Sequence, residues 1–151
     1  MSARPNVALD GSIRRIGVGE VSVHELTFVK DPRGDLSAGE FERQVPFAAR
    51  RYFLVFDVPS KDVRGQHAHR VCHQFLVCAR GRCRVGIDDG RNSTDVLLDR
   101  PNLGLYLPPM IWTTHSRHSS DALLIVFASH YYDPADYIRD YVDFLGKVRE
   151  C

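Results

Sequence analysis

The chain has 151 residues, of which 20 are Lys or Arg and 19 are Asp or Glu, so its formal net charge at pH 7 is +1. Such a balanced charge argues against a nucleic-acid groove or a membrane-surface patch. The sequence lacks an apolar run of about 18 residues and the apolar centre of a signal peptide, so we expect neither membrane insertion nor secretion. A single domain over residues 1–151 is expected, located in the cytoplasm, with residues 1–10 poorly ordered.

Cysteine usage supports the same location. The four cysteines form no CxxC pair of the kind found in zinc and redox sites. We therefore expect reduced thiols at Cys72, Cys78, Cys83 and Cys151.

Short apolar runs separated by turn sequences follow one another through the middle of the chain. They occupy residues 51–58, 74–79, 83–88, 95–99, 103–108 and 122–132. Strands of this length and spacing are typical of an all-β sandwich or barrel. The third of these runs, CRVGID at residues 83–88, places Cys83, Val85 and Ile87 on one face and Arg84 and Asp88 on the other. This alternation predicts a half-buried strand.

Only the segment DPADYIRDYVDFLGKV, residues 133–148, has a helical pattern. Asp133 can cap a helix, and Pro134 suits its first turn. Ile138, Val142 and Leu145 recur at helical spacing. We expect a short C-terminal helix packed against the β-structure.

The stretch RGQHAHRVCHQF contains three of the seven histidines within seven positions. Its framework is that of the first cupin motif, in which a glycine precedes His-x-His, a carboxylate ligand follows, and a second glycine closes the motif. Here Gly65, His67, His69 and Gly81 fit, but Gln74 supplies an amide where the carboxylate is expected.

The second cupin motif would include LGLYLPPMIW, where Pro108 fits and Thr113 stands in place of a histidine. A catalytic divalent metal takes about three good protein ligands, and two histidines with an amide and a hydroxyl make a weak set. His115, however, lies two residues beyond Thr113 and would face the same side of a strand. A third imidazole there keeps a metal site open as an alternative.

Taken together, these motifs resemble the dTDP-4-keto-6-deoxyglucose 3,4-ketoisomerases of the FdtA/QdtA kind, also called WxcM-like, over residues 31–145. The resemblance rests on DPRGDL, VPFAARRYFLVFDV, RGQHAH, HQFLVCARGRCRV, DDG, GLYLPPMIW and ASHYYDPADYIRDY. It implies a cupin or jelly-roll β-barrel with a C-terminal helix, a homodimer that exchanges N-terminal strands, and no metal or cofactor. The implied substrate is a dTDP-linked 4-keto-6-deoxy sugar whose carbonyl moves from C4 to C3 through an enediol.

The resemblance also assigns roles to residues. His67 is the expected base and His69 its assistant, because imidazole, with a pKa near 7, can accept a proton and return it. Arg51 and Arg64 match arginines of the family and can hold a diphosphate through paired hydrogen bonds. The residues expected to bind the sugar nucleotide are Arg51, Arg64, Arg84, Phe53, His73, Gln74, Trp112 and Thr113.

Two polar groups of the family pattern are missing. Phe53 stands where the family has a tyrosine, and neighbouring Tyr52 points to the opposite face of a strand. Thr113 replaces a histidine, and His115 is the expected substitute proton carrier. Two alternatives therefore stay open: a related nucleotide-sugar epimerase or isomerase of different specificity, and a non-catalytic cupin that only binds a nucleotide sugar.

Overall fold

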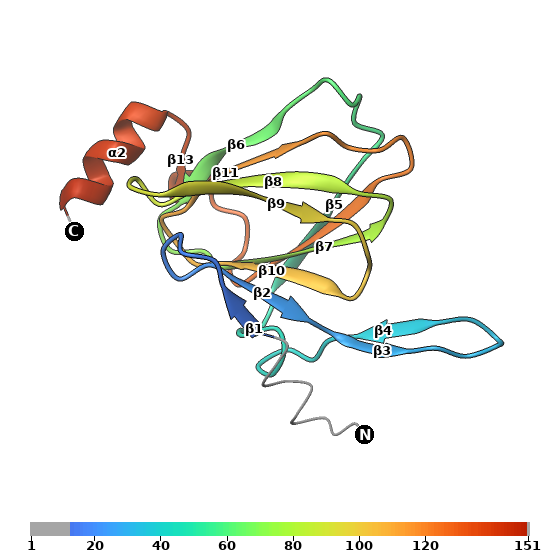
Figure 1. The fold of residues 1–151 in the computed structure, drawn as a ribbon. Helices are drawn as coiled ribbons and strands as arrows, with labels where there is room; N and C mark the ends of the chain where they lie inside the picture. Colours follow the sequence, from blue (N-terminus) through green and yellow to red (C-terminus); the bar gives the residue numbers. More distant parts are fainter. Residues whose placement is uncertain (1–12, 151) are drawn as a thin grey trace.

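The computed structural model describes residues 13–150, so the expectation for residues 1–10 and the thiol of Cys151 lie outside the described residues. The described part is mostly β-structure, with one helix near its C-terminal end (Figure 1). The elements are β1 (Ile13–Arg15), β2 (Ser22–Glu25), β3 (Thr27–Val29), β4 (Leu36–Ala38), β5 (Arg51–Phe56), β6 (Arg64–His69), β7 (Gln74–Arg80), β8 (Cys83–Asp88), β9 (Ser93–Leu98), β10 (Leu103–Leu107), β11 (Trp112–Ser116), β12 (Leu123–Ala128), the 3₁₀ turn η1 (Pro134–Asp136), β13 (Tyr137–Ile138) and α2 (Tyr141–Glu150).

Two antiparallel sheets pack face to face. The six-stranded sheet has the order β1-β2-β10-β7-β12-β5, and the five-stranded sheet has the order β13-β6-β11-β8-β9. The hairpin of β3 and β4 extends away from both sheets (Figure 1). The predicted all-β jelly-roll fold with a short C-terminal helix is confirmed, although the two sheets do not close into a continuous barrel.

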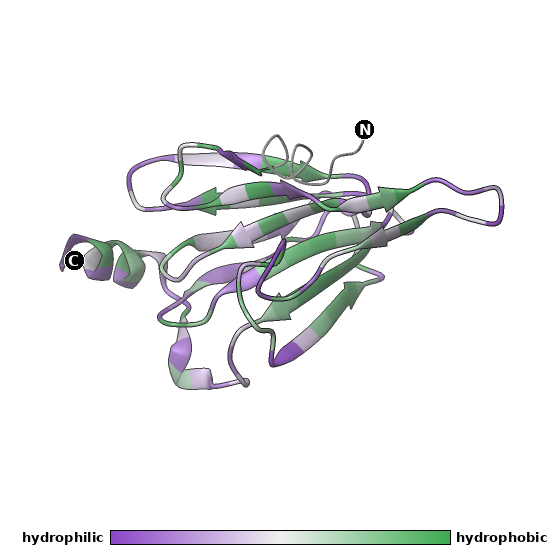
Figure 2. Cartoon of the chain, turned by 90° about the horizontal axis from the view of Figure 1, so that it is seen from below, coloured by the Kyte–Doolittle hydropathy of each residue, from purple (hydrophilic) through white to green (hydrophobic). Residues whose placement is uncertain are grey.

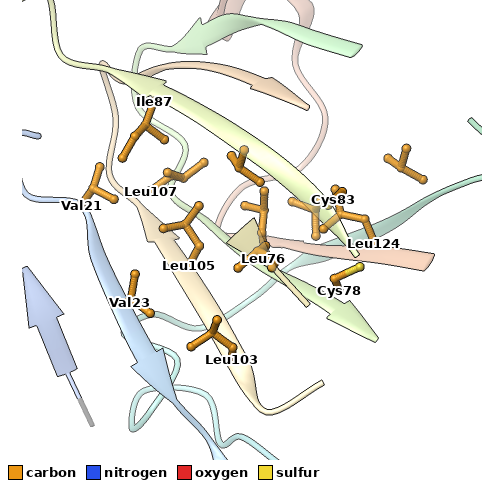
Figure 3. Close-up of a cluster of buried hydrophobic side chains, with 14 of the residues drawn as sticks. Val21, Val23, Leu76, Cys78, Cys83, Ile87, Leu103, Leu105, Leu107 and Leu124 are labelled. Atoms are coloured by element: carbon orange, nitrogen blue, oxygen red, sulfur yellow. The ribbon is translucent and has the colours of Figure 1, made fainter. Parts of the chain in front are cut away.

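The main core lies between the inner faces of the two sheets. Leu76, Leu105 and Leu124 point inward from the six-stranded sheet and are fully buried (Figure 3). The strands are hydrophobic along much of their length and the connecting loops are hydrophilic (Figure 2). In β8 the predicted alternation is confirmed, because Cys83 and the residues at two-residue steps from it are buried. The thiols of the described cysteines, Cys72, Cys78 and Cys83, are free as predicted.

The prediction of one continuous helix over residues 133–148 is wrong in its first half. Asp133 does act as a cap, but of the short turn η1, where its side chain accepts a hydrogen bond from the Ala135 amide. Tyr137 and Ile138 then pair with β6 as β13. Pairing with a strand distant in sequence thus overrides the local helical spacing.

The helix α2 begins only at Tyr141. The Asp140 carboxylate accepts a hydrogen bond from the Val142 amide, which caps the first turn. Phe144 is the fully buried anchor of the helix and packs with Ala68 of β6. No helix within residues 13–150 is long and apolar enough to cross a membrane.

Candidate functional site

Strands β5, β6, β7 and β11 bring polar side chains to the inner space between the sheets. On β5, Arg51 and Phe53 lie on the same face as buried Val55. On β11, Thr113 and His115 are buried while their strand neighbours are only half-buried. The predicted common face of Thr113 and His115 is therefore present, and β11 pairs directly with β6, which carries the histidine motif.

A β-bulge orients the histidine motif. Thr113 pairs with His67, whereas the next residue of β11, Thr114, pairs with Gly65, so Gln66 is an extra residue in β6. Gly65 and Gln66 both have positive φ, 88° and 48°. The extra residue shifts the alternation of side chains along β6. Because Arg64 pairs with His115, both side chains lie on the face that carries His67.

Glycine is required at the bulge. A Cβ atom on Gly65 would lie 3.1 Å from the carbonyl oxygen of Thr113 and 3.3 Å from the Cα of Thr114. The glycine of the RGQHAH motif therefore permits close contact between β6 and β11.

His67 is held in one tautomer. Its Nδ1 atom lies 2.7 Å from the carbonyl oxygen of Gly65, which can only accept a hydrogen bond. Nδ1 therefore carries the proton, and the lone pair of Nε2 is free. Burial lowers the pKa of His67 below its ordinary value, aided by the charge of Arg139. At neutral pH this ring is uncharged and able to accept a proton.

His69 forms a buried pair with Asp136. The Nδ1 atom of His69 donates to Oδ2 of Asp136 over 2.8 Å, and both side chains are at most 7% exposed. The other carboxylate oxygen accepts from the Val71 amide at 2.7 Å. Burial lowers the pKa of His69 to about 4 although Asp136 opposes this effect. The Nε2 atom of His69 has no hydrogen-bond partner among the described residues, and its ring centroid is 4.9 Å from that of His67.

The carboxylate of the pair stays ionised. Burial acts to raise the pKa of Asp136, but hydrogen bonds from the Val71 amide and His69 outweigh it, and the net pKa is lowered. Sequence reasoning missed Asp136 because the segment was interpreted as helix. Its place in the DPADYIRDY motif is the signal that could have identified it.

His115 is buried, with 6% of its surface exposed. Burial lowers its pKa to about 3, and the charge of Arg64 and the protonated forms of His67 and His118 act in the same direction. Its Nδ1 atom has no hydrogen-bond partner among the described residues. The neighbouring Thr113 hydroxyl makes a long hydrogen bond of 3.4 Å to the carbonyl of Ile111.

Aromatic rings and arginines lie beside the histidines. The ring of Tyr137 is 4.9 Å from His67 and 4.5 Å from His69, between centroids. Arg139 stacks over Tyr137 at 4.3 Å. Arg51 lies 5.6 Å from the ring of Tyr132, which in turn contacts Tyr137. The two tyrosines and Arg139 were not among the predicted site residues, although all three belong to the YYDPADYIRDY motif.

Three predicted binding residues lie elsewhere. Trp112 packs on α2, with its ring 5.3 Å from Tyr141. Arg84 is on the outer face of β8 and lines a separate surface cavity of about 1140 Å³. His73 bonds to the Tyr106 hydroxyl at 2.7 Å beside Phe47, a residue of a second hydrophobic cluster.

The remaining predicted residues lie on the inner side. Gln74 is buried and shares the inner face of β7 with Leu76. Arg51 donates from Nε to the carbonyl oxygen of His130 at 3.2 Å, which orients its guanidinium. The structure thus assembles Arg51, Phe53, Arg64, His67, His69, Gln74, Thr113 and His115 on the inner faces of β5, β6, β7 and β11.

Comparison with known proteins shows that the chain is similar to sugar-nucleotide isomerases. Residues 19–149 match the family model FdtA, described as WxcM-like, C-terminal. A TDP-4-oxo-6-deoxy-alpha-D-glucose-3,4-oxoisomerase of Aneurinibacillus thermoaerophilus is 44% identical over 114 residues, which cover 76% of this chain and 82% of that protein. The crystal structure of a 3,4-ketoisomerase from Helicobacter canadensis is 35% identical with a TM-score of 0.83, covering 86% of this chain and 98% of the other.

A third relative was crystallised with a sugar nucleotide. A histidine-to-asparagine mutant of the 3,4-ketoisomerase QdtA from Thermoanaerobacterium thermosaccharolyticum, in complex with TDP-4-keto-6-deoxyglucose, is 27% identical with a TM-score of 0.86. The match covers 88% of this chain and 96% of that one. Its fold therefore extends over nearly all of the described residues.

Proposed function

The chain belongs to the FdtA family, and from this premise we infer that it is an isomerase that moves the carbonyl of dTDP-4-keto-6-deoxyglucose from C4 to C3. One observation carries the mechanism: the Gly65 carbonyl holds His67 with Nδ1 protonated and Nε2 free. A neutral imidazole with a fixed tautomer is the base that this reaction requires. The substrate complex of the QdtA histidine mutant supports the same substrate class.

The reaction needs a proton to leave C3 and a proton to reach C4. In our proposal Nε2 of His67 removes the proton at C3, which is acidic because it adjoins the C4 carbonyl. The electrons form an enediol between C3 and C4. The imidazolium then returns a proton to C4 as the C3 oxygen becomes the carbonyl, so a single group serves as base and acid.

A further proton must pass from the oxygen on C3 to the oxygen on C4. Among residues 13–150, His69, His115 and Tyr137, whose ring lies beside that of His67, carry groups that can exchange it. Asp136 fixes His69 with its lone pair on Nε2, which suits an acceptor. Phe53 has no hydroxyl, so the proposed relay lacks the tyrosine hydroxyl that the family pattern has at this position.

The diphosphate is assigned to the arginines. Arg51 and Arg64 lie on the inner faces of β5 and β6, and Arg64 does so because of the bulge at Gly65. A guanidinium forms paired hydrogen bonds with phosphate oxygens. Arg139, stacked on Tyr137, adds a third positive charge that acts on His67.

Incubation with dTDP-4-keto-6-deoxyglucose in D₂O, followed by NMR, tests the proposed activity. The expected product is a 3-keto sugar, with deuterium at C4 to the extent that the His67 imidazolium exchanges its proton with solvent before returning it. Exchange or inversion at C3 without carbonyl migration would support the alternative epimerase. Tight binding of dTDP without turnover, measured by calorimetry, would support the non-catalytic alternative.

The base assignment has its own test. His67→Asn should lose about 10²–10⁴-fold in turnover while it still binds dTDP, since the amide cannot accept the C3 proton. His130→Asn is the matched control, because His130 is exposed and contacts Arg51 only through its backbone carbonyl. An unchanged rate in His67→Asn would show that another group is the base.

We also propose a homodimer. The outer face of β5 exposes Tyr52, Leu54 and Phe56, each at least 44% accessible. Phe28 and Leu36 of the projecting hairpin are also exposed and line an apolar cavity of about 340 Å³ beside the six-stranded sheet. Exposed apolar surface of this kind typically marks a protein interface.

The hairpin, rather than another segment, would carry the expected exchange of N-terminal strands, because it already stands clear of its own sheets (Figure 1). Analytical ultracentrifugation should find a dimer for the native chain and a monomer for Leu54→Asp. A native monomer would refute this assembly.

The unpaired thiols of Cys72, Cys78 and Cys83 agree with an enzyme of the cytoplasm, which is the location we propose.

A further inference from the structure

A second constellation lies behind the histidine motif, and it includes a thiol that the isomerase reaction does not use. One nitrogen of His69, Sγ of Cys72 and a carboxylate oxygen of Asp136 all lie within 4.8 Å of one another. The three side chains are 5%, 2% and 7% exposed. We propose that they bind a divalent cation of the Zn²⁺ class, and that the bound cation stops turnover at the adjacent site.

The donor set suits a borderline-soft cation. Zn²⁺ binds imidazole nitrogen, thiolate sulfur and carboxylate oxygen, and three protein ligands leave its fourth position to water. With metal bonds of about 2.0–2.3 Å, tetrahedral geometry separates the ligand atoms by about 3.3–3.7 Å. The present separations, all within 4.8 Å and including the 2.8 Å bond between His69 and Asp136, need only small adjustments to reach that range.

The thiol is weakly engaged in the free protein. Sγ of Cys72 donates to the carbonyl oxygen of His73 at 3.4 Å and accepts from the Ser129 hydroxyl at 3.8 Å, and both bonds are weak because sulfur is a poor donor and acceptor. Little is lost when Cys72 turns to a cation. The cluster also lies directly under the surface, because the neighbouring residues Arg70 and Val71 of the loop between β6 and β7 are exposed.

The carboxylate is already oriented. Oδ1 of Asp136 accepts from the Val71 amide at 2.7 Å, and its backbone carbonyl accepts from the Arg70 amide at 2.8 Å. Metal ligands are usually held by such outer contacts, which reduce the cost of ordering them on binding. The ligand from η1 is therefore fixed by the loop that supplies Cys72.

The effect on turnover follows from the chemistry of the imidazole ring and rests on the proposed function. In the free protein Nδ1 of His69 carries the proton, and the lone pair of Nε2 is available beside His67. A cation bound to Nδ1 replaces the proton on that nitrogen. The single proton of the neutral ring must then reside on Nε2, whose lone pair is no longer available. The thiol of Cys72 releases one proton on binding. His69 then can no longer accept a proton in the relay.

Metal binding can be measured by spectroscopy, without an assay of enzyme activity. Protein freed of metal with a chelator is titrated with Co²⁺, and the spectrum is followed for tetrahedral d–d bands and a thiolate-to-cobalt charge-transfer band. The native chain and Cys78→Ala, which alters a different buried cysteine, on β7, should show both. Cys72→Ser should lose the charge-transfer band. Persistence of that band in Cys72→Ser, or no tetrahedral spectrum in the native chain, would overturn the proposal.

The second measurement is inhibition. Zn²⁺ should slow native turnover by about 10²-fold, the scale of one lost acid-base group, and Cys72→Ser should keep its rate in the same Zn²⁺ concentration. Equal inhibition of both proteins would overturn the regulatory part of the proposal. If Co²⁺ binds as expected but metal-free protein shows no ketoisomerase activity, the metal site stands and the proposed function fails.

Discussion

Replacing Gly65 by alanine tests whether the bulge in β6 organises the site. Gly65 has a φ of 88°, and left-handed backbone costs an L-residue about 1–2 kcal/mol. The new Cβ would also meet the backbone of β11 at 3.1–3.5 Å, and backbone cannot move aside as a flexible side chain does. With about 1–3 kcal/mol for such overpacking, the free energy of unfolding should fall by about 2–5 kcal/mol.

Gly17 provides the matched control. Its φ is 81°, almost the same, but an added Cβ would have no atom within 4 Å. Gly17→Ala should therefore lower the free energy of unfolding only by the cost of the left-handed backbone, about 1–2 kcal/mol. The loss of unfolded-state entropy, which favours alanine by about 0.4–1 kcal/mol, applies to both variants and cancels in the comparison.

Urea unfolding of the two variants measures the difference, and turnover measures its consequence. Gly65→Ala should be the less stable and should also lose turnover, because the bulge sets the orientation of Arg64 and His67 and supplies the carbonyl that fixes the His67 tautomer. Gly17→Ala should keep its rate. Equal stability of the two variants, with normal turnover in Gly65→Ala, would refute the reasoning.

Three more predictions concern the titrating groups. Asp136→Asn should lower kcat by about 10–100-fold with little change in KM, since the amide orients His69 less firmly; an unchanged kcat would remove His69 from the relay. Because burial lowers the pKa of His67, kcat/KM should stay constant from pH 8 to about 6.5 and fall only at lower pH; a fall beginning above pH 7 would contradict this assignment. The pKa of His69 is lowered to about 4, so the unfolded chain binds more protons than the folded one between that pH and about 6.5. The free energy of unfolding should therefore fall as the pH drops through this window, by roughly 3 kcal/mol from His69, and His69→Gln should reduce the dependence in chemical denaturation.

The strands of the core could be predicted because their pattern is local. The segment from Cys83 to Asp88 alternates buried and half-buried residues as its sequence indicates. The helix prediction over residues 133–148 failed because Tyr137 and Ile138 pair with β6, a contact that no local spacing contains. That same error hid Asp136, whose partner His69 is 67 residues away in sequence.

Sequence proximity does not decide which of the predicted binding residues share a face. Trp112 and His73 adjoin Thr113 and Gln74 in the chain, but strand alternation sends the neighbours to opposite faces. Phe75 belongs to the outer cluster and Leu76 to the inner core, which shows the same division on β7. Arg64 is the converse case, since only the bulge, signalled by a single glycine, turns it inward.

The charges around the histidines connect substrate binding to basicity. Arg139 lowers the pKa of His67, Arg51 that of His69, and Arg64 that of His115, each in addition to the effect of burial. A diphosphate bound by the arginines brings negative charge that offsets these positive charges. In the binding mode proposed above, the sugar nucleotide would relieve the part of the pKa lowering that the arginine charges cause, and the imidazoles would accept protons better in the complex than in the free protein. The arginines proposed to bind the diphosphate would thus also adjust the basicity of the histidines.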